Sequence, residues 1–294
     1  MAHPPAEAEI TARLASDLVA AQFPAAQFPE WAGRDIGDRF EGWDNVTFRL
    51  GDDLAVRMPR LAVAAELAQV EHTWLQVLSC DWTFAAPVPL AVGAPALGYP
   101  WAWSVVPWIE GVVAAHAPLN AAGRTQLGEA LAQLHVPSPP DAPVCPWRAT
   151  PLAARRSDFL ATLESAALDD VDRDGAVAIY DEGAALTPPA AMWVHLDLHG
   201  LNVVTQGGAL AGIIDWGEMS GGDFAADLGQ ALVLVGEAGM ADVLAGYGAR
   251  IVGDDATRLK AHAVDAAVRL ASSSNPAHSE PGRRALAELG VGAP

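Results

Sequence analysis

Three oxygen-bearing side chains between residues 190 and 220 have the types and spacing that phosphoryl transfer requires. Asp197 is followed five positions later by Asn202, and Asp215 opens an Asp-Trp-Gly sequence thirteen residues after Asn202. A carboxylate such as that of Asp197 can orient a substrate hydroxyl as a general base. Carboxylate and amide oxygens, as in Asp215 and Asn202, are ligands that Mg²⁺ prefers. The pattern therefore predicts Asp197 as the catalytic residue of a nucleotide-dependent phosphoryl transfer, with Asn202 and Asp215 as metal ligands.

The residues around this motif predict strands that would hold it on loops. Residues 192–195 and 210–214 are short apolar runs, and residues 202–204 form a further run before the Gly207-Gly208 turn. A lone Asp or Asn in such a loop is more often a turn or capping residue. The joint spacing, in a context of strand, loop and strand, favours the catalytic interpretation.

The same segment allows a different metal site. His195, Asp197 and His199 form a His-x-Asp-x-His pattern, which could present two imidazoles and a carboxylate to zinc or iron. The other six histidines are scattered without ligand spacing. We therefore keep a metallohydrolase as an alternative and expect His195 to be a buried, hydrogen-bonded imidazole that supports the loop.

The rest of the chain divides into a β-rich first part and a helical second part. Strands are predicted at 46–50, 54–58 and 99–109, helices at 6–22, 61–78, 119–135 and 152–168, and a proline-rich loop at 136–151. Residues 224–270 are predicted to be helical in patches, and residues 272–281 to be a connector before a short terminal helix. This order predicts an α+β fold with two lobes, residues 1–108 and 109–294, and a small-molecule site between them.

Charge and composition argue against several classes of protein. The chain has 36 acidic and 17 basic residues and a net charge of −19, which leaves no cationic surplus for nucleic-acid phosphates. It has no run of about 18 apolar residues, so no membrane span is expected. The N-terminus lacks the basic and apolar segments of a secretory signal, and we expect a cytoplasmic protein. The two cysteines, Cys80 and Cys145, argue against a disulfide framework or a thiolate zinc site.

The segment from Trp193 to Leu228 resembles the aminoglycoside phosphotransferase family, bacterial antibiotic kinases that are related to macrolide and choline kinases; it reads WVHLDLHGLNVVTQGGALAGIIDWGEMSGGDFAADL. Four other segments agree in order within residues 35–270: 42–45, 56–60, 71–75 and 104–111. The resemblance implies a bilobal protein-kinase-like fold, with a small β-rich N-lobe and a larger, mostly helical C-lobe. It implies ATP as the donor, with GTP as the alternative nucleotide, and Mg²⁺. It also implies Asp197 as the base and Asn202 and Asp215 as Mg²⁺ ligands.

The resemblance extends to the nucleotide site. Glu71 is implied to pair with the cationic residue on the second strand of the hairpin, which is Arg57 here and usually Lys in the family. Arg57 keeps the charge and can contact two phosphate oxygens, although its reach and geometry differ from those of Lys. Glu66 is the alternative partner if the helix register differs by one turn.

Two other short segments resemble parts of a nucleotide site. Pro107 and Ile109 resemble the hinge between the lobes, where the Pro107 carbonyl and the Ile109 amide would bind the adenine edge. Asp44 and Asn45 lie in the segment that would cover the phosphates, although no glycine-rich phosphate motif is present. Two tryptophans near the hinge are candidates to flank the base, with burial in the core as the alternative: Trp103 and Trp108.

The chain departs from the family pattern at three positions. Besides Arg57, Leu196 stands where the family often has Gly, and Phe224 where it often has Pro. Arg57 and Leu196 together suggest an alternative function, an ATP-binding protein with weak or no transferase activity. Asp227 resembles the family's structural aspartate, which bonds the catalytic loop from the start of a helix.

The acceptor is the least determined part of the site. The family implies phosphorylation of an alcohol group on a small molecule, with an aminoglycoside or a related antibiotic as the first expectation. Five carboxylates would suit a cationic amino sugar: Glu218, Asp223, Glu237, Asp242 and Asp265. Each of them alone would more often belong to a solvated helix face. The sequence specifies no oligomeric state.

Overall fold

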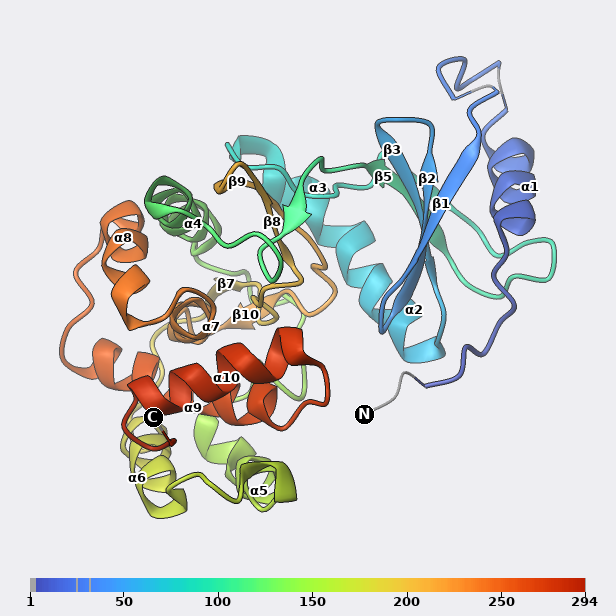
Figure 1. Ribbon diagram of the computed structural model, residues 1–294. Coiled ribbons are helices and arrows are strands. Elements are labelled where there is room, and N and C mark those ends of the chain that lie inside the picture. Colours follow the sequence, from blue (N-terminus) through green and yellow to red (C-terminus); the bar gives the residue numbers. More distant parts are fainter. Residues whose placement is uncertain (1–3, 25, 32, 294) are drawn as a thin grey trace.

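The computed structural model describes residues 4–24, 26–31 and 33–293, and it has an antiparallel sheet beside a larger helical region (Figure 1). The sheet has the strand order β1-β2-β3-β5-β4, and each strand is antiparallel to its neighbours. Its strands are β1 (Ile36–Glu41), β2 (Asn45–Leu50), β3 (Leu54–Pro59), β4 (Ala91–Gly93) and β5 (Trp103–Pro107).

The core of this sheet is covered by the first helix, α1 (Ala12–Gln22). Burial alternates along β2, because successive side chains of a strand point to opposite faces. Phe48 and Leu50 on the inner face pack in one cluster with Ala15 and Leu18 of α1. The period-2 pattern of the sequence therefore sets which face of the sheet is buried.

A helical segment connects the sheet to the helical region (Figure 1). It consists of α2 (Ala62–Val70), a π-helical turn (Glu71–Leu75), α3 (Gln76–Leu78) and a 3₁₀ turn (Ser79–Asp81). A π-helical turn changes the helix register and is frequent at functional sites. Leu75, at the end of this turn, packs in the core of the helical region.

The helical region contains seven helices with two small sheets between them, of strand orders β10-β7 and β6-β8-β9, in the part of the chain that the structure describes. The helices are α4 (Ala121–Leu134), α5 (Leu152–Leu163), α6 (Arg173–Ala184), α7 (Ala225–Val235), α8 (Glu237–Tyr247), α9 (Asp254–Ala271) and α10 (Pro276–Glu288), with a 3₁₀ turn at Ala166–Leu168. The strands are β6 (Val112–Val113), β7 (Met192–Val194), β8 (Val203–Gln206), β9 (Ala209–Ile213) and β10 (Ser220–Gly222).

Helix α9 is the central helix of this region and packs against α5, α6, α7 and α10. Small residues allow the close approach of its neighbours. Gly183 of α6 lies so near α9 that an added Cβ would be 2.3 Å from the Cβ of Ala261. Any larger residue at position 183 would clash with Ala261, so the close packing of α6 on α9 depends on this glycine.

Most of the predicted elements are confirmed. The hairpin, the helix from 61 to 78, the helix from 119 to 135 and the three strands around Asp197 are all present, with ends shifted by a few residues. The predicted strand at 99–109 is shorter and spans β5. The helical stretch from 224 to 270 is three helices, which are interrupted at Gly236 and at residues 248–253.

The two-residue strand β6 was not predicted, nor were three further elements that lack a periodic apolar pattern. β1 is an edge strand whose residues are mostly exposed, and β10 is a short Ser-Gly-Gly strand. α6 carries Gly175 and Gly183, which lower helix propensity, and its packing on α9 compensates. The predicted connector at 272–281 is too long, because α10 already begins at Pro276. Pro276 has no backbone N–H, but the N–H groups in the first turn of a helix have no intrahelical partner, so a proline is tolerated there.

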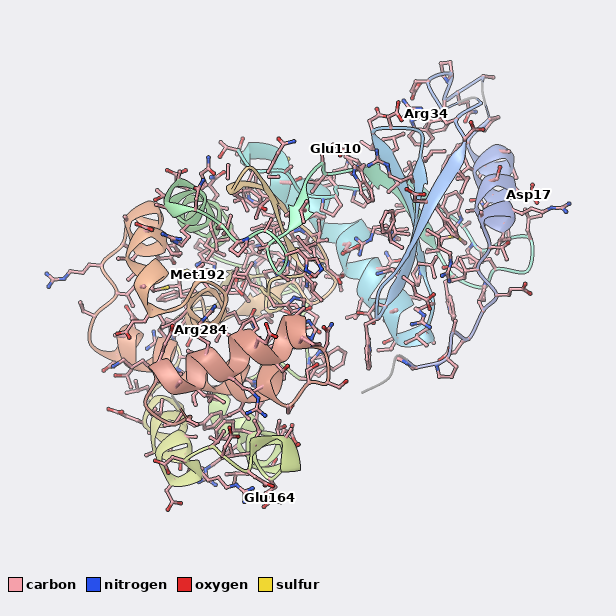
Figure 2. All side chains as sticks on the ribbon, in the orientation of Figure 1. Asp17, Arg34, Glu110, Glu164, Met192 and Arg284 are labelled. Atoms are coloured by element: carbon pink, nitrogen blue, oxygen red, sulfur yellow. The ribbon has the colours of Figure 1, made fainter. Side chains whose placement is uncertain are left out.

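The predicted lobe boundary at residues 108 and 109 falls between β5, in the first sheet, and β6, which pairs with β8 of the helical region. We keep this boundary as a proposal. Glu110 lies where the two parts of the chain meet (Figure 2), and its carboxylate pairs with Arg49 of β2 at 2.9 Å.

None of the helices in the described residues is both long enough and apolar enough to cross a membrane.

Candidate active site

The loop that carries Asp197 lies between β7 and β8 and is anchored by a buried carboxylate of α7. Asp227, in the first turn of α7, accepts hydrogen bonds from the N–H groups of His195 (2.7 Å) and Leu196 (2.8 Å). The same carboxylate lies 3.1 Å from Nε2 of His135. Asp227 is fully buried, so these contacts are shielded from water. The loop backbone is therefore fixed just before Asp197.

Leu196 has a left-handed backbone conformation with a φ of 67°. Gln230 stabilises this conformation, since it accepts the Leu198 N–H (2.5 Å) and donates to the Leu196 carbonyl (2.6 Å). The Leu196 side chain is 1% exposed and packs in a small cluster with Cys145 and Ala226. Leu at this position, where the family often has Gly, therefore adds buried apolar contact at the cost of a strained φ.

We expect Leu196→Gly to lower the free energy of unfolding by about 2 kcal/mol or more. The loss of a buried Leu side chain outweighs the relief of roughly 1 kcal/mol of left-handed strain. Leu97→Gly is the matched control, because Leu97 is also left-handed (φ 53°) but 59% exposed, and we expect it to preserve or raise stability. Urea unfolding of the three proteins measures the difference, and a Leu196→Gly variant more stable than the wild type would show that strain dominates.

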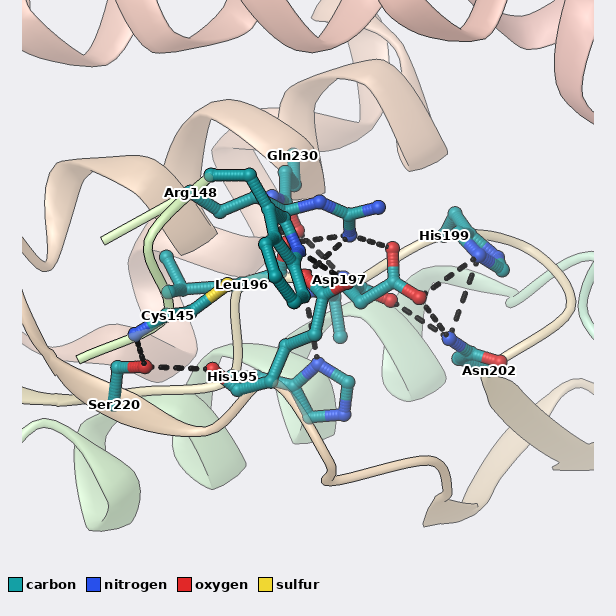
Figure 3. A network of polar contacts seen from close by, with 12 residues as sticks. Cys145, Arg148, His195, Leu196, Asp197, His199, Asn202, Ser220 and Gln230 are labelled. Atoms are coloured by element: carbon teal, nitrogen blue, oxygen red, sulfur yellow. Dashed lines mark hydrogen bonds and ion pairs between the residues drawn. The ribbon is translucent and has the colours of Figure 1, made fainter. Parts of the chain in front are cut away.

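Figure 3 shows Arg148, His199 and Asn202 gathered around the Asp197 carboxylate. Arg148 forms an ion pair with Asp197 and lies 2.9 Å from the carboxylate of Glu218. Asn202 Nδ2 donates to Asp197 Oδ2 at 3.0 Å, and His199 Nε2 lies 3.4 Å from the same oxygen. Burial raises the pKa of Asp197, but Arg148 and His199 outweigh burial and hold it well below its usual range. Asp197 is therefore ionised at neutral pH and can accept a hydrogen bond from a hydroxyl.

Two residues at this site were missed by sequence reasoning. Arg148 comes from the proline-rich loop at 136–151, and His278 of α10 packs its ring 4.6 Å from the ring of His199. Neither belongs to a motif, and both are distant from Asp197 along the chain. Since only the tertiary fold brings them to the loop, no local pattern could have identified them.

A second cluster joins the sheet to the helical region. Arg57 of β3 donates to Glu71 at 2.7 Å and to Asp215 at 3.3 Å. The other carboxylate oxygen of Glu71 accepts the Trp216 N–H at 2.8 Å. Glu66 is exposed, so Glu71 and not Glu66 is the partner of Arg57. The π-helical turn begins at Glu71, where the register of the helix changes.

Asp215 is the centre of a group of mutually repelling carboxylates. It follows β9 with a left-handed φ of 64°, which Asp tolerates. Burial raises its pKa, Arg57 opposes the shift, and the charges of Glu71, Asp197 and Asp44 raise it further, to about 7. A divalent cation would relieve this repulsion. The Asp215 carboxylate is therefore suited to be one ligand of a metal ion.

Asn202 offers the second oxygen of the predicted metal site. Its Nδ2 donates to the side chain (3.0 Å) and to the main-chain carbonyl (2.9 Å) of Asp197. Because the amide nitrogen is used in this way, Oδ1 is left to bind a cation. One carboxylate and one neutral oxygen suit a Mg²⁺ ion that also binds water and phosphate oxygens.

The alternative His-x-Asp-x-His metal site is wrong. The imidazole of His195 is buried, and both nitrogens are used: Nδ1 accepts the Asp197 N–H (3.2 Å), and Nε2 donates to the Ile214 carbonyl (3.1 Å). Burial lowers the pKa of His195, so the ring is neutral. Across residues 4–24, 26–31 and 33–293, no three His, Cys, Asp or Glu side chains form a group that could hold a metal ion.

The predicted hinge residues lie where the chain leaves the sheet. Pro107 ends β5, and the next residue, Trp108, donates its N–H to the Asp53 carbonyl at 2.8 Å. No acceptor for the Ile109 N–H is found among the described residues. The Ile109 N–H can therefore donate a hydrogen bond to the edge of a nucleotide base.

Asp44 and Asn45 lie at the turn from β1 to β2. The Asn45 carbonyl accepts the Gly42 N–H at 2.9 Å, and the Asp44 carbonyl accepts the Arg60 N–H at 2.9 Å. Burial and the charge of Asp197 raise the pKa of the Asp44 carboxyl. Asp44 is therefore within electrostatic reach of Asp197, although the two residues come from different parts of the fold.

The two tryptophans near the hinge have different environments. Trp103 is fully buried in the core of the sheet, so it does not flank a nucleotide. Trp108 is half-buried, and the Arg49 guanidinium lies 4.3 Å from its ring centroid. Trp108 is the one of the two that a bound base could reach.

The five acidic candidates for the acceptor site are not brought together. Three are ion-paired elsewhere in the helical region: Asp223 with Arg258, Asp242 with Arg124 and Asp265 with Arg155. Glu237 is exposed at the start of α8. Glu218 lies near the loop that carries Asp197, since Arg148 contacts both carboxylates. These contacts do not build the anionic pocket that the sequence suggested.

Comparison with known proteins agrees with this geometry. The model of the phosphotransferase enzyme family matches residues 39–262. A comparison with curated proteins gave no match.

Solved structures of antibiotic kinases share the fold over nearly the whole chain. The GDP complex of aminoglycoside 2'-phosphotransferase-IIIa is 18% identical with a TM-score of 0.71, over 95% of this chain and 98% of that one. Macrolide 2'-phosphotransferase MphH from Brachybacterium faecium is 21% identical with a TM-score of 0.59, over 92% and 98%. The streptomycin and ATP complex of APH(2")-IIa is 17% identical with a TM-score of 0.60, over 90% of each chain.

These similarities confirm the predicted α+β fold, the kinase-like fold of the aminoglycoside phosphotransferases. The family model covers most of the chain and includes the β2–β3 hairpin and the loop that carries Asp197. The protein therefore belongs to the phosphotransferase enzyme family.

Proposed function

We propose that the protein is a small-molecule kinase that transfers the γ-phosphoryl group of ATP to a substrate hydroxyl with Mg²⁺. The observation that carries the proposal is a pair of neighbouring clusters, Arg57 with Glu71 and Asp215, and Asp197 with Asn202. They are joined next to Asp215, where the Ile214 N–H donates to the Asn202 carbonyl at 2.9 Å. They supply a cation for phosphates, two oxygens for a metal ion and an ionised carboxylate for the acceptor. In this family of reactions catalysis consists mostly of positioning and charge stabilisation.

The proposed donor site uses residues of both parts of the chain. Asn202 and Asp215 would hold Mg²⁺, which neutralises phosphate charge when it is bound. Arg57 would contact phosphate oxygens while Glu71 holds its guanidinium in place. A bidentate guanidinium suits this role, so the replacement of the usual Lys by Arg57 is compatible with transfer.

The proposed base is Asp197. Its carboxylate is ionised and held by Asn202, so it can accept the hydrogen bond of an attacking hydroxyl and then its proton. Arg148 occupies one of its oxygens, and an acceptor hydroxyl would share or replace this contact. The base is thus oriented before the acceptor arrives.

The nucleotide would lie against the hinge. The Pro107 carbonyl and the Ile109 N–H would bind the edge of the base, and Asp44 and Asn45 would lie over the phosphates. Main-chain recognition of this kind suits ATP, and GTP is the alternative donor, since one structural relative was crystallised with GDP and another with ATP. We also propose a cytoplasmic location, where ATP and Mg²⁺ are supplied.

Aminoglycosides and macrolides are the first acceptors to test, because structural relatives act on them by name. The alternative is an ATP-binding protein with weak or no transferase activity. The test is an ATP-consumption screen over aminoglycosides, macrolides, choline and sugars, with Mg²⁺ and with excess chelator.

We expect turnover with at least one hydroxyl-bearing acceptor and its loss on chelation. We also expect Asp215→Ala to lower turnover by a factor of about 100 or more, because it removes the carboxylate ligand of the metal. Asp242→Ala, which removes a carboxylate of α8 that pairs with Arg124 of α4, is the control and should keep full activity. Nucleotide binding without turnover over the whole panel would favour the alternative, and chelator-resistant turnover would contradict the metal assignment.

A further inference from the structure

The turn that joins β1 to β2 leads to the face of the sheet that carries Arg57. In the β2–β3 ladder Thr47 is directly opposite Arg57, and Asn45 is opposite Pro59, two residues further along each strand. Opposite residues of an antiparallel pair share a face of the sheet, and so do alternate residues of one strand. Asn45, where the turn enters β2, is therefore on the face from which Arg57 reaches Glu71. The turn is thus placed beside any phosphate group that Arg57 contacts.

The main chain of this turn has a donor that the protein does not use. The Gly42 N–H is bonded within the turn, where the Asn45 carbonyl accepts it at 2.9 Å. The Asp44 N–H, in contrast, has no acceptor within residues 4–24, 26–31 and 33–293. Main-chain N–H groups of turns are common donors to phosphate oxygens. The Asp44 N–H is therefore a candidate contact for the nucleotide.

Arg60, just after β3, fixes the turn from the protein side. Its guanidinium donates to the Gly42 carbonyl at 3.3 Å and pairs with the Glu41 carboxylate at 2.9 Å. Its main-chain N–H donates to the Asp44 carbonyl at 2.9 Å. Arg60 is only 4% exposed, and charge-assisted hydrogen bonds are strong where water is excluded. The Arg60 side chain thus restrains the turn at Glu41 and Gly42, and its main chain restrains it at Asp44.

The Arg60 side chain is itself held by the N-terminal segment of the chain. Its guanidinium donates to the Pro4 carbonyl at 2.9 Å, and its own carbonyl accepts the Glu7 N–H at 2.9 Å. The Glu7 carboxylate accepts the N–H of Ala62, the first residue of α2, at 3.0 Å. Because both its guanidinium and its main chain are bonded in this way, Arg60 is a fixed support for the turn.

We propose that Arg60 is a positioning residue of the nucleotide site, which holds the β1–β2 turn ready to bind the phosphates of the nucleotide. This inference rests on the proposed kinase function and deepens its donor site, since the polar groups of Arg60 bond the protein and not the ligand. A turn that is ordered before the nucleotide arrives loses less conformational entropy on binding. The base, which would bind at the hinge, does not depend on this turn.

The test separates the phosphates of the nucleotide from its base. Calorimetry measures the binding of a non-hydrolysable ATP analogue with Mg²⁺, and of adenosine, which has the same base but no phosphate. The proteins are the wild type, Arg60→Gln and Arg60→Lys, and the KM for ATP and kcat are measured with an acceptor from the screen. Arg39→Gln is the matched control, because Arg39 pairs with the other oxygen of the same Glu41 carboxylate from an exposed position on β1.

We expect Arg60→Gln to weaken binding of the ATP analogue by about tenfold and to raise the KM for ATP by a similar factor. Adenosine binding and kcat should stay within about threefold of the wild type, because the hinge and Asp197 are unchanged. Arg60→Lys should bind the analogue with intermediate affinity, since Lys keeps the charge beside Glu41 but lacks the planar fork of donors. Arg39→Gln should bind both ligands as the wild type does.

Amide hydrogen exchange of the wild type tests the same role of the turn without a substitution. The ATP analogue should slow exchange at residues 42–45, and adenosine should not, because only the analogue carries phosphates for the turn to bind. This measurement decides the question if Arg60→Gln does not fold.

Equal losses of analogue and adenosine binding in Arg60→Gln would show a purely structural role and overturn the proposal. Unchanged binding of the analogue in Arg60→Gln, unchanged exchange at residues 42–45 in its presence, or a wild type that binds neither ligand would also overturn it. The kinase proposal fails separately. If the analogue binds in a manner that depends on Arg60 but no acceptor is phosphorylated, the positioning role stands and the kinase proposal does not.

Discussion

Asp197→Asn is expected to lower the rate of phosphoryl transfer by about a thousandfold and to leave binding of the Mg²⁺–nucleotide complex within a few-fold of the wild type. The amide cannot accept the proton of the attacking hydroxyl. The change leaves Arg57, Glu71 and Asp215 in place, and Asn202 can donate to the amide oxygen of the new Asn as it does to Oδ2 of Asp197, so the donor site keeps its charges. The measurements are steady-state transfer to an acceptor found in the screen, and a nucleotide titration by fluorescence or calorimetry.

The replacement also removes an ion pair with Arg148, so stability has to be measured alongside activity. Asp181→Asn is the matched control, because Asp181 also pairs with an arginine, Arg156, but on the outer surface of the helical region. We expect the control to keep full activity. If Asp197→Asn kept more than about a tenth of the wild-type rate, Asp197 would not be the base.

Asp227→Ala is expected to give the largest loss of stability, about 3 to 5 kcal/mol in the free energy of unfolding. The buried carboxylate accepts the N–H groups of His195 and Leu196 and contacts His135, so its removal leaves buried donors unsatisfied. Asp242→Ala is the control, since its pair with Arg124 is partly exposed and should be worth less than about 1 kcal/mol. Urea unfolding measures both, and losses of equal size would contradict the anchoring role.

The pH dependence of stability provides a second measurement on Asp227 in case the Ala variant does not fold. Burial raises its pKa, but hydrogen bonding and charge from His135 and the hydrogen bond from the His195 N–H outweigh burial, and the pKa is lowered on folding. The stabilisation is then fully present above the unfolded value of about 3.9 and is lost as the pH falls through the folded value. Asp227→Asn should therefore lower stability near pH 7 and show a shallower loss toward acid. An unchanged acid slope would mean that Asp227 is not among the groups whose protonation unfolds the protein.

Much of the fold and the core of the candidate site could be predicted because their signals are local. The spacing of Asp197, Asn202 and Asp215, and the short apolar runs around them, lie within about 25 residues, a range in which strand and turn preferences act directly. The hairpin that carries Arg57 has the same kind of signal. Elements without a periodic pattern, such as α6 and β1, escaped prediction because neighbours along the chain do not determine them.

The sequence by itself determined the family, the α+β order of elements and the three residues proposed for catalysis and metal binding. Only the tertiary structure decided between Glu71 and Glu66 as the partner of Arg57, and only it showed that three of the acidic acceptor candidates are used in ion pairs and that Arg148 lies beside Asp197. The reason is physical. A motif encodes the local geometry of a loop, whereas the partner of a long charged side chain depends on how distant helices pack, and no short-range pattern specifies that packing.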